Sequence, residues 1–225
     1  MQVAGSGTTW TIGGNAASDI DLLGGGLTNL TITGALSGTL NTAGAITGQT
    51  TLGSVSGALD VAGAIADLDV TGALGATGSV IADAIGPVTI GTNLAGSLTS
   101  RAGGAIGNTT VGNDLSGTLT SGLTLGTLGV TPDLGGTGST NGAIGAVSVG
   151  HNLGGTVTAS GVGTGLTVGN DLSGAVDIAG AGGSATITGS LTAPATLRAA
   201  DWRSTLFLSS RSLGFVSSLA FSAAA

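Results

Sequence analysis

The chain has 225 residues, including 46 glycines, and its 11 aspartates and 4 arginines give a net charge of −7 without lysine, glutamate or cysteine. This balance excludes a nucleic-acid-binding surface, which needs clustered Lys and Arg, and the lack of cysteine excludes disulfides and thiolate metal sites. The 41% hydrophobic content is too high for a disordered polar segment. No apolar run is long enough for a bilayer, so we expect no transmembrane segment.

One turn recurs along the chain. It reads IGTNLAG at 90–96, VGNDLSG at 111–117, VGHNLGG at 149–155 and VGNDLSG again at 168–174. The apolar residue inside this turn returns every 19–21 residues, at Ala16, Leu36, Val55, Leu74, Leu94, Leu115, Leu134, Leu153, Leu172 and Leu191. A fixed period of this length is the signature of a repeat fold.

Three further apolar columns keep the same period. One precedes the turn, at Ile12, Ile32, Leu52, Val70, Ile90, Val111, Val130, Val149, Val168 and Ile187. One follows it, at Ile20, Leu40, Leu59, Leu98, Leu119, Val157 and Val176, with gaps expected at Thr77 and Gly138. The last occupies Ile46, Ile65, Ile85, Ile106, Leu125 and Ile144.

The segments between the turns have the alternation of strands. LTITG at 30–34 and GTLTS at 117–121 alternate apolar and polar residues, and frequent glycine disfavours helix. Parallel stacking of such repeats predicts an all-β fold, a right-handed parallel β-helix (β-solenoid) of about ten coils. We assign residues 1–195 to this repeat domain and expect the turn leucines to face inward.

The residues of the turn indicate a structural role rather than ion binding or catalysis. Its glycines allow positive φ, and we expect its Asx residues to bond their own backbone or the neighbouring coil. Those residues are Asn15, Asn93, Asp114, Asp133, Asn152 and Asp171. GNDLSG resembles the calcium-binding repeats of toxins, but Ala35, Ser54 and Ala73 replace the Asx residue in three successive coils. We therefore expect no metal and no cofactor.

Catalysis is also not expected. Aspartates fall in neighbouring repeats at Asp60, Asp67, Asp69 and Asp83, and Asp67 and Asp69 share one face of a strand. The nearest base is Arg101, two coils beyond Asp60, whereas acid–base catalysis needs partners held together. His151 takes a turn position that Asn, Thr or Gly fills elsewhere, so we expect an exposed turn residue.

A row of threonines offers an alternative function. The residue before the first apolar column is Thr11, Thr31, Thr51, Thr89, Thr110, Thr167 and Thr186, with interruptions at Asp69, Gly129 and Ser148. Flat threonine rows on solenoids resemble ice-binding faces, yet threonine is also an ordinary outward strand residue that bonds its neighbour in the next coil. The row therefore leaves a binding protein for ice or polysaccharide open.

The period stops after Pro194. Residues 196–225 hold three of the four arginines and four of the five aromatics, and the candidate assembly residues are Trp202, Arg203, Phe207, Arg211, Phe215 and Phe221. A solenoid end exposes unpaired backbone groups, so this segment either caps the last coil or docks on another subunit. The N-terminal repeat has no comparable cover, which favours head-to-tail self-association.

The period, the Gly/Asn turns and the Thr/Val strands at roughly 8–195 resemble the β-helical passenger regions of bacterial filamentous haemagglutinins and autotransporter adhesins, and the Gly/Thr-rich β-strand repeat proteins of bacterial surfaces. That resemblance implies a secreted or cell-surface location and a structural role as stalk, fibre or adhesin. We expect a non-enzymatic subunit or segment of an extracellular bacterial filament.

Overall fold

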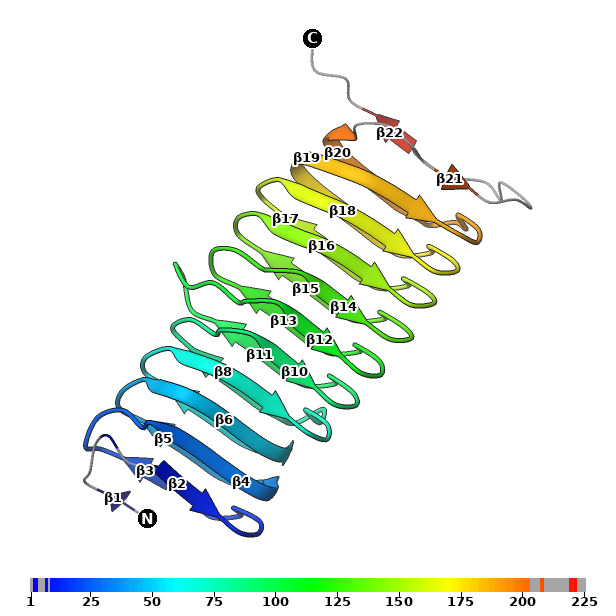
Figure 1. Ribbon diagram of the computed structural model, residues 1–225. Helices are drawn as coiled ribbons and strands as arrows, with labels where there is room; N and C mark the ends of the chain where they lie inside the picture. The colour runs from blue at the N-terminus through cyan, green and yellow to red at the C-terminus, as the bar shows by residue number, and fades with distance from the viewer. Residues whose placement is uncertain (1, 4–6, 8, 203–206, 209–218, 222–225) are drawn as a thin grey trace.

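The computed structural model describes residues 2–3, 7, 9–202, 207–208 and 219–221. The chain winds into a parallel β-solenoid of about ten coils, stacked into a rod with the N-terminal coil at one end and β19 (Ala175–Ile187) near the other (Figure 1). The all-β prediction is confirmed, because the described part of the chain forms strands and turns without a helix. It therefore contains no helix long and apolar enough to cross a membrane.

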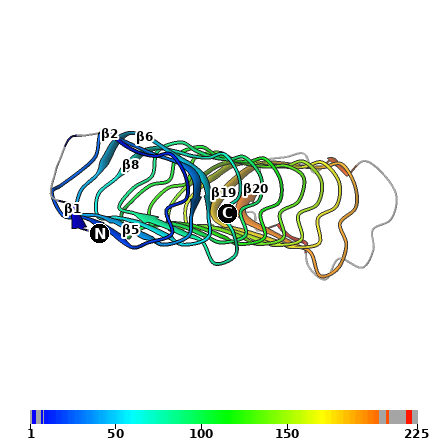
Figure 2. The ribbon, with the colours of Figure 1, turned by 90° about the horizontal axis from the view of Figure 1, so that it is seen from below.

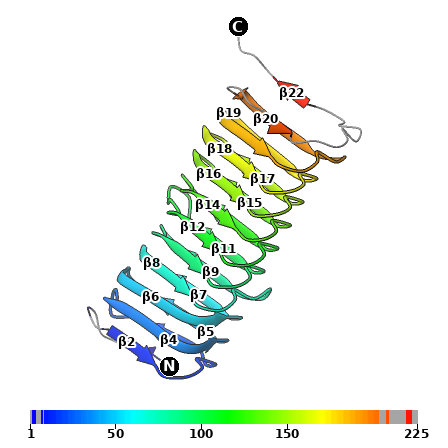
Figure 3. The ribbon, with the colours of Figure 1, turned by 45° about the vertical axis from the view of Figure 1, so that its right-hand side comes forward.

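Two parallel sheets form the long sides of the rod, and their strands lie on opposite sides of each coil (Figure 3). Sheet A contains β1 (Gln2–Val3), β3 (Ile20–Leu22), β5 (Thr39–Thr42), β7 (Ala58–Val61), β9 (Ser79–Ala82), β11 (Ser97–Ser100), β13 (Thr118–Ser121), β15 (Thr137–Thr140), β17 (Thr156–Ala159), the first part of β19, β20 (Thr196–Trp202) and β22 (Leu219–Phe221).

Sheet B contains β2 (Thr9–Ile12), β4 (Asn29–Leu36), β6 (Ile46–Val55), β8 (Ile65–Val70), β10 (Val88–Ile90), β12 (Thr109–Val111), β14 (Leu128–Val130), β16 (Ile144–Val149), β18 (Gly163–Val168), the last part of β19 and β21 (Phe207–Leu208). Every pairing in both sheets is parallel, and the coils keep the same outline along the rod (Figure 2).

The core is a stack of in-register columns. All ten turn residues from Ala16 to Leu191 bridge to their counterparts in the next coil, and the column from Ile12 to Ile187 pairs throughout sheet B. Central members such as Leu115 have 0% exposure. Both column predictions are therefore confirmed. The sequence reading missed that Leu27 begins the Ile46 column.

The gap expected at Thr77 is wrong. Val80 fills the sheet A column there, pairing with Leu59 on one side and Leu98 on the other. Val80 lies six residues after Leu74, whereas Leu98 lies four after Leu94, so two extra residues displace the strand along the sequence but not in space. The exposed Thr77 lies in the longer turn.

Small hydroxyl residues replace aliphatic ones in part of the core. Thr42, Ser100, Ser121 and Thr140 are buried where the chain leaves sheet A. The hydroxyls of the first three donate to carbonyl oxygens of the following turn, for example Ser100 Oγ to Gly104 O at 2.8 Å and Ser121 Oγ to Thr124 O at 2.7 Å. The Thr140 hydroxyl donates to Leu123 O in the turn one coil earlier, at 2.8 Å. These bonds satisfy backbone carbonyls of the turns that would otherwise lack a partner inside the coil stack.

The glycines of the repeating turn serve close packing, not positive φ. Among the described residues, positive φ occurs at Gly7, Gly25, Gly103 and Gly183, all outside this turn. The turn instead stacks Gly117, Gly136, Gly155 and Gly174, where a Cβ atom would collide with the carbonyl oxygen of the glycine one coil before. The freedom of glycine to adopt positive φ is therefore not used at these positions, which need glycine because consecutive turns lie almost in contact.

Candidate functional site

The Asx residues form a ladder between coils. The Oδ1 atom of each accepts a hydrogen bond from the backbone N–H of the equivalent residue one coil later. The bonds join Asn93 to Asp114 at 3.1 Å, Asp114 to Asp133 at 3.3 Å, Asp133 to Asn152 at 2.8 Å, Asn152 to Asp171 at 3.3 Å and Asp171 to Ser190 at 2.7 Å. Asn15 binds Ala35 N in the same way, at 2.9 Å. Of the two bonding modes expected, the described turns use the one between coils.

The four clustered aspartates fall on two different sides of the rod. Asp67 and Asp69 lie on β8 in sheet B, whereas Asp60 lies on β7 in sheet A and Asp83 directly follows β9. The sheets are separated by the core, so these carboxylates do not form one site.

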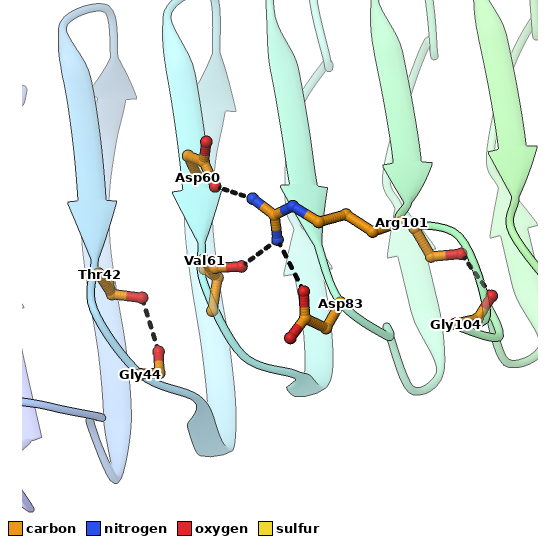
Figure 4. Close-up of polar contacts among 8 residues, drawn as sticks. Thr42, Gly44, Asp60, Val61, Asp83, Arg101 and Gly104 are labelled. Atoms are coloured by element: carbon orange, nitrogen blue, oxygen red, sulfur yellow. Dashed lines mark hydrogen bonds and ion pairs between the residues drawn. The ribbon is translucent and has the colours of Figure 1, made fainter.

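Arg101 reaches back across two coils from the end of β11 (Figure 4). Its Nη2 atom pairs with Asp60 Oδ1, and its Nη1 atom donates to Asp83 Oδ1 at 3.2 Å and to Val61 O at 2.6 Å. The expectation that no base accompanies these acids is therefore wrong for Asp60 and Asp83. The cluster ties three coils together and uses the guanidinium for that contact.

His151 is exposed at the repeating turn, as expected. Its backbone N–H donates to Pro132 O at 2.8 Å, and its carbonyl accepts Asn170 N at 2.9 Å, so its main chain continues the ladder of that turn. Across the described residues, no group of three or more His, Cys, Asp or Glu side chains is placed to hold a metal ion.

The threonine row of sheet B lies in register as predicted. Consecutive pairs join Thr11 to Thr31 and Thr51, and Thr89 to Thr110. Asp69, Gly129 and Ser148 occupy the same column and interrupt it, before Thr167 and Thr186 resume it. Three coils are thus its longest unbroken stretch.

A more regular hydroxyl surface lies on sheet A, which the sequence reading missed. Strands β11, β13, β15 and β17 each present two outward Ser or Thr residues, in columns that continue without interruption over four coils. The columns are Ser97, Thr118, Thr137 and Thr156 beside Thr99, Thr120, Ser139 and Thr158. We call these eight residues the sheet A hydroxyl array.

The array is uncharged and makes few internal bonds. Ser97 Oγ lies 3.2 Å from Thr99 Oγ1, and Ser139 Oγ donates to Thr120 Oγ1 at 3.3 Å. Ile81 continues the second column on the N-terminal side and Asp177 on the C-terminal side. The sequence signal was a pair of Ser or Thr residues two positions apart in each of four consecutive strands.

Three of the six candidate assembly residues lie in described strands at the C-terminal end of the rod. Trp202 ends β20, Phe207 begins β21 and Phe221 ends β22. The other three, Arg203, Arg211 and Phe215, lie outside the described residues. At the opposite end, Trp10 and Ile12 are partly exposed and pack on the core, whereas Leu30 and Ile32, one coil inward, have 0% exposure.

No family model, curated protein or solved structure matches this chain. The coil stack, its faces and its ends are therefore the features from which a function is proposed.

Proposed function

We propose that the chain is a non-enzymatic structural subunit or segment of an extracellular bacterial fibre, stalk or adhesin, and that its rods associate end to end. The observation that carries this proposal is the unbroken ladder. Both sheets keep parallel pairing from β1 and β2 at one end to β21 and β22 at the other. A rod built this way extends by adding equivalent coils.

The side chains support a structural role. The core columns are aliphatic, the turns bond to one another through Asx side chains, and the best-placed cation, Arg101, is committed to Asp60 and Asp83. General acid–base catalysis needs groups that are positioned for a substrate, and these groups are positioned for neighbouring coils. Placement at a bacterial surface is supported by the resemblance in repeat length and composition.

Electron microscopy of the purified chain at increasing concentration tests the proposal. We expect unbranched filaments with the width of one rod, and analytical ultracentrifugation should show mass growing with concentration. Short particles of monomer mass at the highest concentration would contradict end-to-end association.

The sheet A hydroxyl array favours a second candidate, a binding protein that uses a flat Ser/Thr-rich face. Hydroxyls in such columns lie roughly 4.8 Å apart along the rod and roughly 6.6 Å apart across it. A regular two-dimensional net of this kind orders water and so fits the surface of ice. Polysaccharide recognition is less well supported, because the sequence has no aromatic residue between Trp10 and Trp202.

Two lysine variants on one coil separate the faces. Thr120→Lys interrupts the sheet A hydroxyl array, while Thr110→Lys places the same side chain on the threonine row of sheet B. We expect inhibition of ice recrystallisation by the full chain, lost in Thr120→Lys and kept in Thr110→Lys. The reverse result would assign binding to sheet B, and an inactive full chain would exclude the ice candidate. Pull-down on crystalline cellulose or chitin tests the polysaccharide alternative.

A further inference from the structure

We infer that the peptide bond between Arg101 and Ala102 is a masked cleavage site for an arginine-specific endoprotease. The ion pairs of Arg101 with Asp60 and Asp83 are the mask. Cleavage is a hydrolysis in which water adds across the bond, leaving a carboxylate on Arg101 and an amine on Ala102. The site lies in the middle of the rod and is independent of any contact at its ends.

The coil stack offers such a protease one side chain to recognise. The chain has no lysine, and its arginines are Arg101, Arg198, Arg203 and Arg211. An arginine-specific protease of the trypsin type binds the guanidinium of its substrate through a carboxylate in its specificity pocket. Arg101 is therefore the one position at which this kind of enzyme would divide the coil stack rather than shorten its C-terminal segment.

The bond lies in an extended corner of the coil stack. Residues 101–105 join β11 to the buried Ile106, whereas the shorter segment 122–124 makes the same connection in the next coil. Ala102 and Gly103 are exposed, and a Cβ atom on Gly103 would have nothing within 4 Å. Exposed loop tips with small residues are the preferred sites at which proteases cut folded chains. The backbone of this corner is therefore open to a protease.

The corner is anchored to the rod at its first residue. The Arg101 N–H donates to Ala82 O in the preceding coil at 2.9 Å. The Gly104 N–H closes the turn on Arg101 O at 2.9 Å, and the φ of 84° at Gly103 is that of the third residue of a type II turn. The Gly103 N–H reaches Gly122 O only at a long 3.4 Å. The contacts of Arg101 are thus the main obstacle to opening the turn.

The guanidinium is held over the coils that precede the turn (Figure 4). Its Nη2 atom pairs with Asp60, while Nη1 donates to Asp83 Oδ1 at 3.2 Å and to Val61 O at 2.6 Å. Two carboxylates and a carbonyl thus occupy the group that a protease must bind. The same contacts fix the first residue of the turn, so they oppose both recognition of the side chain and local opening of the backbone.

A cut at this bond would leave the rod in one piece. Strand β11 would belong to the N-terminal fragment and β13 to the C-terminal fragment, yet the two strands pair in parallel. Strands β10 and β12 pair across the same boundary, and Leu94 bridges to Leu115. Neighbouring coils of a solenoid are stabilised by this interface. The product is therefore a nicked rod with two new chain ends at one corner.

Limited digestion with trypsin tests the mask. The double variant Asp60→Asn with Asp83→Asn removes both ion pairs. The matched control, Asp67→Asn with Asp69→Asn, makes the same change of charge on β8 in sheet B. We expect the first variant to be cut after Arg101 at least about tenfold faster than the natural chain, because proteolysis follows the population of the opened turn. The control should be cut at the natural rate.

Mass spectrometry identifies the fragment that ends at Arg101, and cuts in the C-terminal segment are common to all the chains compared. The two fragments of the nicked rod should elute together in size-exclusion chromatography and separate only in denaturant. Circular dichroism before digestion shows whether each variant keeps its β-sheet.

Arg101→Lys is a second variant that leaves both carboxylates in place. Trypsin also cuts after lysine, but the ammonium group lacks the fork with which the guanidinium contacts Asp60 and Asp83 together. We therefore expect faster cleavage after position 101 in this variant too. Equal rates in the natural chain and both variants, or no cleavage after position 101 in any of them, would overturn the inference. Equal acceleration in the Asp67/Asp69 control would overturn it as well, because loss of charge alone would then explain the cut.

Discussion

Thr50 illustrates how tightly a coil position is specified. It is fully buried in sheet B between Leu30 and Leu68, and among the described side chains only its hydroxyl is buried without a hydrogen-bond partner. A buried, unbonded hydroxyl costs about 1–3 kcal/mol. Thr109 occupies the same column but donates from Oγ1 to Gly107 O at 3.3 Å.

We expect Thr50→Val to raise the free energy of unfolding by about 1 kcal/mol, since valine has nearly the same shape and removes the unbonded oxygen. Thr109→Val is the matched control; it loses a hydrogen bond, so its stability should be unchanged or lower. Chemical unfolding followed by circular dichroism measures both. A Thr50→Val variant less stable than Thr109→Val would show that the Thr50 hydroxyl does have a partner.

The contacts of one side chain, Arg101, were not predicted from the sequence. The period placed Arg101 two coils beyond Asp60, and the ion pairs were missed because that separation was treated as too long for a contact. Two coils are roughly 9.6 Å along the axis, which the arginine and aspartate side chains span together. The period predicted which residues stack in columns, but it did not predict which side chains reach across two coils.

At the scale of the element, the repeating turn is held by close contact. Gly136 lies so near Gly117 that a Cβ would meet its carbonyl oxygen, while a Cβ on the adjacent Gly135 would have nothing within 4 Å. The same turn therefore contains one glycine required by packing and one that is not. Sequence alone does not separate them, because both are glycine in a glycine-rich turn.

Gly136→Ala should lower the free energy of unfolding by about 1–3 kcal/mol, because the coils must separate to admit the methyl group. Gly135→Ala should be neutral or stabilising by up to about 1 kcal/mol, through a less flexible unfolded chain. Thermal unfolding of the two variants in parallel measures the difference. Equal melting temperatures would contradict the close contact between turns.

The Asx ladder gives a prediction about metals. One oxygen of each ladder residue from Asn93 to Asp171 already accepts a backbone N–H from the next coil. A chelator should therefore leave the β-sheet content and the melting temperature unchanged. Loss of structure on calcium removal, reversed when calcium is restored, would instead make these turns ion-binding loops.

Of the two rows of outward hydroxyls, one on each sheet, only the one on sheet B was predicted from the sequence. The sheet B threonine row followed from counting back from the turn, and the structure keeps its register. The sheet A hydroxyl array flanks the predicted column of Leu98, Leu119 and Val157, and it was missed because it mixes serine with threonine, so no single residue type repeats along it. The pairing of Thr118 with Ser97 and Thr137 shows that its hydroxyls lie side by side.

At the scale of the whole molecule, the coil at each end of the described rod has a neighbouring coil on one side only. Each coil is stabilised by its two neighbours, so the end coils of any such stack keep less of their apolar surface covered. Trp10 and Ile12 show this at the N-terminal end of the described rod. End-to-end contact and capping are two physical solutions to this exposure, and the proposed function assigns the first of them to residues 196–225.

Deleting residues 196–225 distinguishes these solutions. The deletion removes β20, β21 and β22, the strands at the C-terminal end of the described rod. We expect it to abolish filaments, or to change their axial repeat, while circular dichroism still reports β-sheet from the remaining coils. A full-length chain that stays monomeric at high concentration, with a deletion that only lowers the melting temperature, would make the segment a cap.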